Sequence, residues 1–256
     1  MRYALAEKCS SEQNAVMSTD PVLTRVHDLW ERLAAVPVSF SSPDPVNVVV
    51  SPKSMICPPG WAGFVVLRGR AIVTAPSPSA AASIRSAVAK LPVENLVDPD
   101  SLSRELPLAH VLGPATLAYA DEHAFQAAAQ GSVLIDRLSS GRPDLHRLGI
   151  LAGEEEWAES GLGEITSPVF VIRIQGEVVA AAGFRTWPGR TAHMSVLTAP
   201  EVRGRGLARL TGSAAVAHAL EVGLLPQWRA RAPQSKRVAF ALGFREFGAQ
   251  LSVELG

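Results

Sequence analysis

The chain has 256 residues, of which 47% are hydrophobic and 19% charged. This balance is that of a globular protein rather than a disordered one, and the length allows one large core or two smaller ones. Because the formal net charge is zero, no global field attracts nucleic acid or an anionic membrane, and any site for an anion must be local.

The sequence shows no feature that would direct the chain out of the cytoplasm. The first twenty residues carry charged and polar side chains where a signal peptide needs an uninterrupted apolar core, and no run approaches the ~20 apolar residues of a membrane span. Cys9 and Cys57 are too few for a disulfide framework and lack the paired spacing of a zinc site. We therefore expect a cytoplasmic monomer or homodimer without a metal, a membrane contact or a nucleic-acid partner.

The first hundred residues predict a small α/β lobe. A capping side chain before Pro21, followed by apolar residues at helical spacing, predicts a helix that runs to Leu33. Composition and turn residues predict further elements, namely strands over 46–50, 64–67 and 71–74 and a helix over 79–91. The turn-rich stretch that follows places a boundary near Leu106, which divides the chain into an amino-terminal lobe (1–105) and a second domain (106–256).

The second domain is predicted to contain an antiparallel meander and two well-defined helices. Its first part predicts a strand over 115–120, a helix from Asp121 to about Gln130, a break over 139–144 and a helix over 154–160. The meander comprises strands over 168–175, 178–187 and 191–199. A helix from Leu207 that ends before Gly223, a strand over 225–231, a helix over 233–241 and a strand over 247–255 complete the domain.

One turn in this domain has the features of an anion-binding site. Arg203-Gly204-Arg205-Gly206-Leu207-Ala208 connects the last meander strand to a helix. A strand that feeds a glycine-rich turn before a helix presents free backbone N–H groups and the positive end of the helix dipole to an anion. Arg203 and Arg205 can add charge-assisted hydrogen bonds, so the turn suits a pyrophosphate.

Two common nucleotide motifs do not fit the same residues. A Walker loop requires Gly-Lys-Ser or Gly-Lys-Thr after its glycines, and the sequence has neither. A dinucleotide fingerprint requires a small residue at the position of Arg209 within a parallel βαβ unit, whereas the preceding strands are predicted to be antiparallel. An exposed turn without a ligand remains the simple alternative.

The context of the turn resembles the GNAT (GCN5-related N-acetyltransferase) superfamily. Arg203, Gly206 and Ala208 match its coenzyme A loop, and Ser235 through Phe244 resemble its second conserved block at the expected distance. The resemblance covers about residues 159–256. Within it, the run from Ala192 through Leu255 is also similar to two-lobed actinobacterial acetyltransferases whose substrates are generally unassigned. The resemblance implies an α/β (α+β) fold with a mixed, mostly antiparallel sheet flanked by helices, beside a smaller amino-terminal α/β lobe.

The resemblance also implies a reaction. Acetyl-coenzyme A would lie between strands 191–199 and 225–231, and an acceptor amine would attack its thioester directly. The implied coenzyme-binding residues are Val196, Leu197, Thr198, Arg203, Gly204, Arg205, Gly206, Leu207, Ala208 and Ser235. His193 is the candidate base, because an imidazole titrates near neutrality and an ammonium acceptor must lose a proton. Glu164 and Glu177 are weaker candidates.

Two departures from the family pattern leave the activity open. Ala239 occupies the position where many relatives have a tyrosine that protonates the leaving thiolate, and Ala232 replaces a frequent asparagine. Trp187 and Trp228 are either acceptor-pocket residues or ordinary packing residues. An alternative function is therefore an inactive or weakly active acyl-coenzyme-A sensor. A nucleic-acid-binding module that uses its turn arginines conflicts with the zero net charge.

Overall fold

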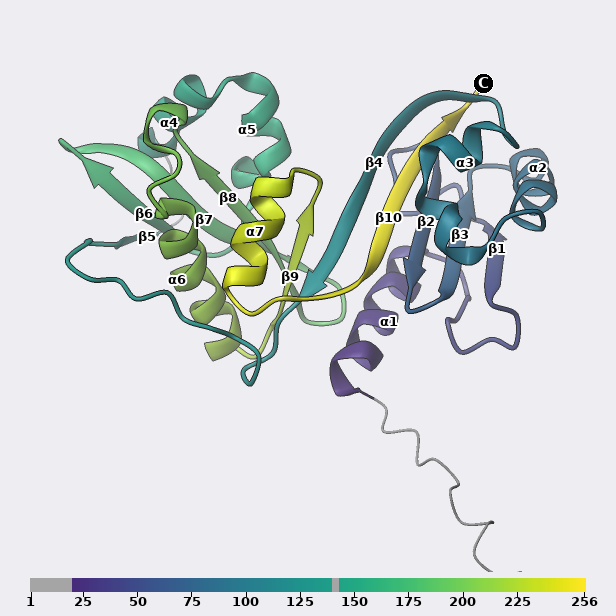
Figure 1. Cartoon of the computed structure of the whole chain (residues 1–256), viewed down its shortest axis with the longest axis horizontal. Coiled ribbons are helices and arrows are strands. Elements are labelled where there is room, and N and C mark those ends of the chain that lie inside the picture. Colours follow the sequence, from purple (N-terminus) through teal and green to yellow (C-terminus); the bar gives the residue numbers. More distant parts are fainter. Residues whose placement is uncertain (1–19, 140–142) are drawn as a thin grey trace, which may run out of the picture.

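The computed structural model describes residues 20–139 and 143–256, in which a single ten-stranded sheet runs through the molecule (Figure 1). The strand order is β1-β3-β2-β10-β4-β9-β8-β7-β6-β5. The pairs β1–β3 and β8–β9 are parallel and the remaining pairs are antiparallel. The mixed, mostly antiparallel sheet flanked by helices is confirmed.

The strands are β1 (Val46–Val50), β2 (Ala62–Leu67), β3 (Arg70–Ala75), β4 (Leu108–Tyr119), β5 (Asp136–Leu138), β6 (Val169–Ile174), β7 (Glu177–Trp187), β8 (Thr191–Thr198), β9 (Leu225–Ala230) and β10 (Arg245–Leu255). The helices are α1 (Pro21–Leu33), α2 (Pro78–Val88), α3 (Pro99–Ser103), α4 (Pro143–Ala152), α5 (Glu154–Ser160), α6 (Leu207–Glu221) and α7 (Pro233–Ala241). Short 3-10 turns are η1 (Val93–Val97), η2 (Leu162–Glu164) and η3 (Pro200–Val202). No helix within the described residues combines the length and the apolar character that a membrane span requires.

Helices cover both faces of the sheet. On one face, here called the α1/α4 face, apolar side chains of α1 pack against Leu117 and Leu225, and those of α4 pack against Leu197. On the other, the α6/α7 face, Val216 of α6 and Ala239 of α7 pack in one cluster with the strands. Side chains alternate along a strand, so consecutive residues within β8, and likewise within β9, point to opposite faces of the sheet.

The two long strands β4 and β10 join the amino-terminal lobe to the rest of the molecule (Figure 1). β10 pairs with β2 of the lobe on one side and with β4 on the other. The strands approach so closely that a Cβ added at Gly248 would lie 1.8 Å from the carbonyl oxygen of Val66. The carboxy-terminal strand is therefore part of the lobe's sheet, and the proposed division at residue 105 stays a prediction.

The sequence-based expectation for the start of the chain is accurate. Asp20 caps α1, because its Oδ1 accepts a hydrogen bond of 3.0 Å from the N–H of Val22. The helix buries Val26, Leu29 and Trp30. Strands β1, β2 and β3 occupy the predicted positions, with the hairpin turn at residues 68–69.

The predicted helix from Asp121 to Gln130 is wrong. Asp121 accepts from the N–H of Ala124 at 2.8 Å, but the helical turn that it starts does not continue. The N–H of Gln126 donates instead to the carbonyl of Leu242, and the N–H of Ala128 donates to Ser213 Oγ. These long-range bonds satisfy the backbone groups that a helix would use internally. Tertiary contacts therefore override the local alanine-rich propensity.

Three elements were not predicted in full. β4 begins at Leu108, seven residues before the predicted strand, and pairs with β10 along its whole length. The short edge strand β5 ends just before the predicted break over 139–144, and α4 begins within it, at Pro143; residues 140–142 lie outside the described residues.

Candidate active site

β8 and β9 hydrogen-bond to each other only where they begin. Thr191, Ala192 and His193 pair with Leu225, Pro226 and Gln227, and the later residues of the two strands are not paired. A cavity of about 730 Å³ opens between the separated strands. Trp228 and Arg229 both line it, although Trp228 packs in the α6/α7 cluster and Arg229 points to the opposite face. The cavity therefore gives access to both faces of the sheet.

The predicted anion turn forms one end of this cavity. Gly204 and Gly206 have φ angles of +79° and +77°, which favour glycine because a side chain is strained there. Gly206 is the N-cap of α6 and has no side-chain capping bond. The backbone N–H groups of residues 204–208 donate to no acceptor within 20–139 and 143–256. These groups are free to bind an anion at the positive end of the helix dipole.

Most of the predicted coenzyme-binding residues lie together. The cavity wall includes Val196, Leu197, Thr198, Arg203, Gly204, Gly206, Leu207, Ala208 and Ser235. Arg205 is exposed and is not part of that wall. The predicted residues other than Arg205 therefore line one cavity, and their role in binding coenzyme A stays a prediction.

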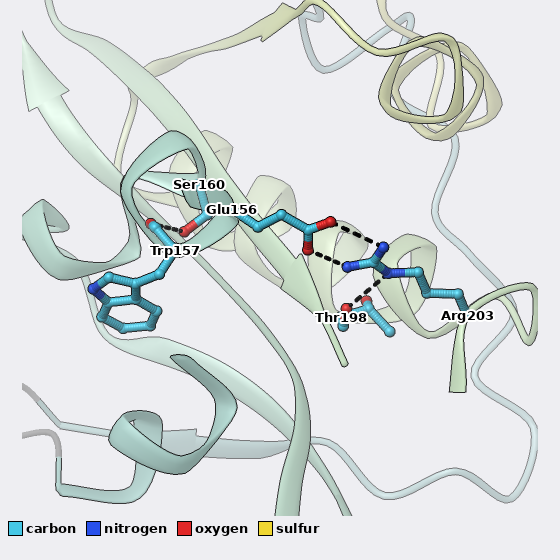
Figure 2. Close-up of polar contacts among 5 residues, drawn as sticks. All are labelled: Glu156, Trp157, Ser160, Thr198 and Arg203. Atoms are coloured by element: carbon cyan, nitrogen blue, oxygen red, sulfur yellow. Dashed lines mark hydrogen bonds and ion pairs between the residues drawn. The ribbon is translucent and has the colours of Figure 1, made fainter. Parts of the chain in front are cut away.

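Arg203 has a protein partner that the sequence does not reveal. Figure 2 shows its guanidinium group forming a fork with the carboxylate of Glu156, with Nη1 3.1 Å from Oε1 and Nη2 bonded to Oε2. Its Nε donates to the carbonyl of Thr198 at 3.1 Å. Helix α5, which carries Glu156, also carries Glu159, and Glu159 forms an ion pair of 3.0 Å with Arg231. Helix α5 is therefore tied to the ends of both separated strands.

The side chain of Thr198 is an unsatisfied group in the wall. Its Oγ1 is buried and has no hydrogen-bond partner among the described residues. A buried hydroxyl without a partner costs about 1–3 kcal/mol. Thr198 lines the cavity, so a polar atom of a bound ligand can supply the missing partner.

The charge of the wall favours an anionic ligand. Five arginines and two glutamates line the cavity, and both glutamates are already paired with arginines. Arg209 of α6 and Arg237 of α7 have no ion-pair partner in the described part of the chain. The α6/α7 end of the cavity is therefore positively charged.

His193 lies at the apex, where the strands begin to separate. Its Nδ1 is 2.9 Å from Gln227 Oε1, and Gln227 Nε2 donates to the hydroxyl of Tyr119 at 3.0 Å. That hydroxyl also accepts from Trp30 Nε1 of helix α1 at 2.7 Å. With an amide oxygen as its partner, Nδ1 carries the proton and Nε2 keeps a lone pair. A hydrogen-bonded chain therefore connects the apex to the amino-terminal lobe.

The surroundings of His193 keep its imidazole neutral. Trp187 stacks on the ring with centroids 4.1 Å apart. Burial, reinforced by the positive charge of Arg229, lowers the pKa of His193 to about 3. Such a group is a weak base at neutral pH, and His193 is not among the residues that line the cavity. Its assignment as the catalytic base stays a prediction.

The comparison with known families agrees with this geometry. Residues 152–249 match the family model described as GNAT acetyltransferase. This part of the chain belongs to the GNAT superfamily. The GNAT domain therefore includes the turn, both separated strands and helices α5, α6 and α7. The predicted superfamily is confirmed for residues 152–249, and with it the assignment of this part of the chain to an acyltransferase family.

Solved GNAT structures resemble parts of the chain. A GNAT-family protein from Novosphingobium aromaticivorans is 26% identical, with 57% of this chain and 65% of that chain covered and a TM-score of 0.44. One from Kribbella flavida is 18% identical, with coverages of 60% and 62% and a TM-score of 0.48. Another from Colwellia psychrerythraea is 17% identical, with 61% of each chain covered and a TM-score of 0.45. This chain thus spans less than two thirds of each of these proteins. No curated protein matches the sequence.

Residues 235–244, predicted to correspond to a second conserved GNAT block, lie on α7 and in the turn that follows it. Ser235 lines the cavity, and its Oγ accepts a hydrogen bond of 2.9 Å from Trp228 Nε1. Ala239 is buried with the α6 core and is not a lining residue. Ala232 is the N-cap of α7 and makes no side-chain capping bond. Neither Ala232 nor Ala239 therefore adds a polar side chain to the site.

Of the other candidate residues, only Trp228 lines the GNAT cavity. Glu164 is exposed and forms an ion pair with Arg185. Glu177 is exposed at the start of β7 and pairs with Arg147 at 3.0 Å. Trp187 packs on His193, whereas Trp228 lines the cavity. Sequence reasoning missed Glu156, Glu159 and Arg229, since pairing across the fold leaves no signal in local spacing.

Proposed function

We propose that the chain transfers an acetyl group from acetyl-coenzyme A to an amine acceptor by direct attack in a ternary complex. The observation that carries this proposal is the cavity between β8 and β9, which has free backbone N–H groups at one end and access to both faces of the sheet. One substrate can therefore enter from each face. The GNAT family model supports the same reaction class.

The α6/α7 face suits the coenzyme. Residues 204–208 offer N–H donors to the pyrophosphate, and Arg209 and Arg237 add positive charge nearby. The open edge of β8 provides further donors, because alternate backbone groups bond to β7 and the others point toward the gap. Donors on this edge can hold the thioester carbonyl and stabilise the negative charge that develops on its oxygen.

The chemical step needs little beyond positioning and a proton acceptor. The lone pair of the neutral amine nitrogen attacks the carbonyl carbon, a C–N bond forms, the C–S bond breaks and the thiolate leaves, and the proton that the nitrogen then loses passes through water to the thiolate. Holding the two reactants in contact supplies a large part of the rate enhancement. An alkylammonium with a pKa of about 10.4 must first lose a proton. With its lowered pKa, the His193 imidazole serves this step better as a fixed hydrogen-bonding group than as the final proton acceptor.

An acyl-coenzyme-A sensor is the second candidate. Ala239, at the position of the usual family acid, is buried and carries no proton donor. A protein that binds the coenzyme without releasing its thiol would fit that observation. The coenzyme site is the same in both candidates, and only turnover separates them.

Calorimetric titration with coenzyme A tests the site, and release of free thiol from acetyl-coenzyme A with a panel of amines tests the reaction. Saturable binding with amine-dependent thiol release is expected. Absence of saturable binding would contradict both candidates. Binding without thiol release for any amine would favour the sensor.

A further inference from the structure

Arg229 occupies the side of the cavity that the coenzyme turn does not reach. It lies two residues after Gln227, the last residue of β9 that pairs with β8. At about 3.3 Å per residue, its Cα is about 7 Å along the strand from the apex of the cleft. It faces the α1/α4 side of the sheet, whereas the turn and Trp228 belong to the α6/α7 side. Its side chain lines the cavity.

The guanidinium group of Arg229 is held in place by neutral groups. Its Nη1 donates to Gln250 Oε1 at 3.2 Å, and its Cζ lies 5.8 Å from the ring centroid of Trp187. Gln250 is itself fixed, because its Nε2 donates to the carbonyl of Ile56 in the amino-terminal lobe. An aromatic face and an amide oxygen orient the cation without neutralising it.

Arg229 forms no ion pair of its own in the described part of the chain, and Glu159, whose charge acts on it from a distance, is already paired with Arg231. Arg203 and Arg231, which line the same cavity, are paired with Glu156 and Glu159. Among the residues that the structure describes, no carboxylate forms an ion pair with Arg229. The side chain remains accessible to solvent, although protein surrounds it enough that burial, together with Arg231, lowers its pKa. A structural role would need only a hydrogen bond to Gln250, which a neutral donor could also make.

We propose that Arg229 binds an anionic group of the acceptor, so that the substrates are amines that carry a carboxylate or a phosphate a few bonds from the nucleophilic nitrogen. This inference rests on the proposed function, because it assigns the acceptor to the face opposite the coenzyme. A guanidinium group pairs with carboxylate and phosphate oxygens through two parallel N–H bonds, which fixes the orientation of the acceptor as well as its position.

The test is a calorimetric titration with matched amines, run with and without saturating coenzyme A. Glycine is compared with glycinamide, and aminomethylphosphonate with methylamine, so that each pair differs in the anion. The anionic member of at least one pair is expected to bind at least tenfold more tightly, and the preferred pair distinguishes a carboxylate from a phosphate. The run with coenzyme A alone reports failure of the proposed function separately.

Three variants decide whether Arg229 is responsible. Arg229→Gln should weaken the anionic amine at least tenfold and leave the neutral amine and coenzyme A within about twofold. Arg229→Lys keeps the charge and should recover part of the loss. Arg137→Gln is the matched control, because Arg137 is exposed, lies over the ring of Phe170 at 6.0 Å and is not a cavity residue. Thermal midpoints establish that each variant is folded.

Four outcomes would overturn the inference. The first is equal binding of anionic and neutral amines by the wild-type protein. The second is an equal loss of both classes in Arg229→Gln, which would indicate a general structural effect. The third is absence of binding for every anionic amine. Retention of the preference in Arg229→Gln would assign it to another group and would count against Arg229 equally.

Discussion

The chain contains the tripeptide Arg-Gly-Arg twice, and the two copies have different structural roles. Residues 68–70 close the β2–β3 hairpin, and residues 203–205 precede helix α6. The central glycines have nearly the same backbone angle, with φ of +78° at Gly69 and +79° at Gly204, and neither has an atom within 4 Å of an added Cβ. The tripeptide and its glycine conformation therefore do not determine what the turn does.

The surroundings of the two turns account for the difference. After the first turn, Arg70 donates to the backbone carbonyls of Phe40, Ser42 and Asp44, and the chain continues as a paired strand. After the second, Gly206 opens a helix whose first N–H groups are free. The first turn thus stabilises a loop, and the second leaves donors for a ligand. A following helix, rather than the arginines, makes an anion site.

The largest expected effect comes from placing tryptophan in each turn. Gly206→Trp should weaken coenzyme A binding at least 100-fold, because the indole would occupy the space in front of the free N–H groups. Gly69→Trp carries nearly the same backbone strain, since its φ of +78° matches the +77° of Gly206, but should leave coenzyme A affinity within about twofold. Both variants should lose about 1–2 kcal/mol of unfolding free energy. Calorimetry and chemical denaturation measure the two quantities, and a similar coenzyme affinity in both variants would contradict the site.

Smaller effects on stability and coenzyme affinity are expected when Arg70, after the first turn, or Arg203, at the start of the second, is replaced. Arg70→Gln should lower the free energy of unfolding by about 2 kcal/mol, because charged hydrogen bonds to carbonyls of a loop are lost. Arg203→Gln should change stability by less than about 1 kcal/mol, since the ion pair with Glu156 is exposed. It should weaken coenzyme A about three- to tenfold. Denaturation curves that show the reverse order of stability loss would show that the two arginines have been assigned the wrong roles.

Removal of the Arg203 counterion, Glu156, should strengthen coenzyme A binding rather than weaken it. Glu156→Gln frees the guanidinium group for phosphate and removes a negative charge from the cavity wall, so coenzyme A should bind about fivefold more tightly, roughly 1 kcal/mol. Added salt should reduce the gain. Glu155→Gln is the control, because Glu155 is exposed on the same helix and does not line the cavity. If Glu156→Gln weakened binding, the ion pair would be positioning the turn rather than competing with the ligand.

The parts of the fold that local patterns define were predictable from the sequence. The meander, the glycine turn and the cap of α1 depend on residues within one turn or one strand, and each lies where it was expected. The helix after Asp121 failed for the opposite reason, because its backbone bonds go to Leu242 and Ser213, far away in the sequence. The early start of β4 likewise depends on pairing with β10, which comes more than 100 residues later.

The candidate site divides in the same way. The turn from Arg203 to Ala208 is one continuous segment, so its sequence was enough to predict that it connects a strand to a helix. The groups that complete the cavity, Glu156, Glu159 and Arg229, come from separate elements and have no shared spacing. Only the folded sheet brings α5 to the ends of both separated strands and places Arg229, a cation without an ion pair among the described residues, on its α1/α4 face.

A further expected effect concerns His193, which belongs to neither turn. Its pKa of about 3 lies below the unfolded value of about 6.5, so acid should favour the unfolded state, which binds the proton more readily. Unfolding free energy should therefore fall as the pH decreases from about 7, and the decrease should be shallower in His193→Gln. His27 also has a pKa lowered by burial, but it is present in both proteins and cancels from the difference.

The same pair of proteins separates a positioning role from catalysis by the base. If His193 is neutral throughout the working range, His193→Gln lowers kcat/KM by about tenfold or less and leaves the shape of its profile between pH 6 and 9 unchanged, because no proton is exchanged at the imidazole. An ionisation near pH 6–7 that the substitution abolishes would instead show that His193 is the base. Its pKa would then be near neutral in the complex, and the hydrogen-bonded chain through Gln227, Tyr119 and Trp30 would be what tunes it.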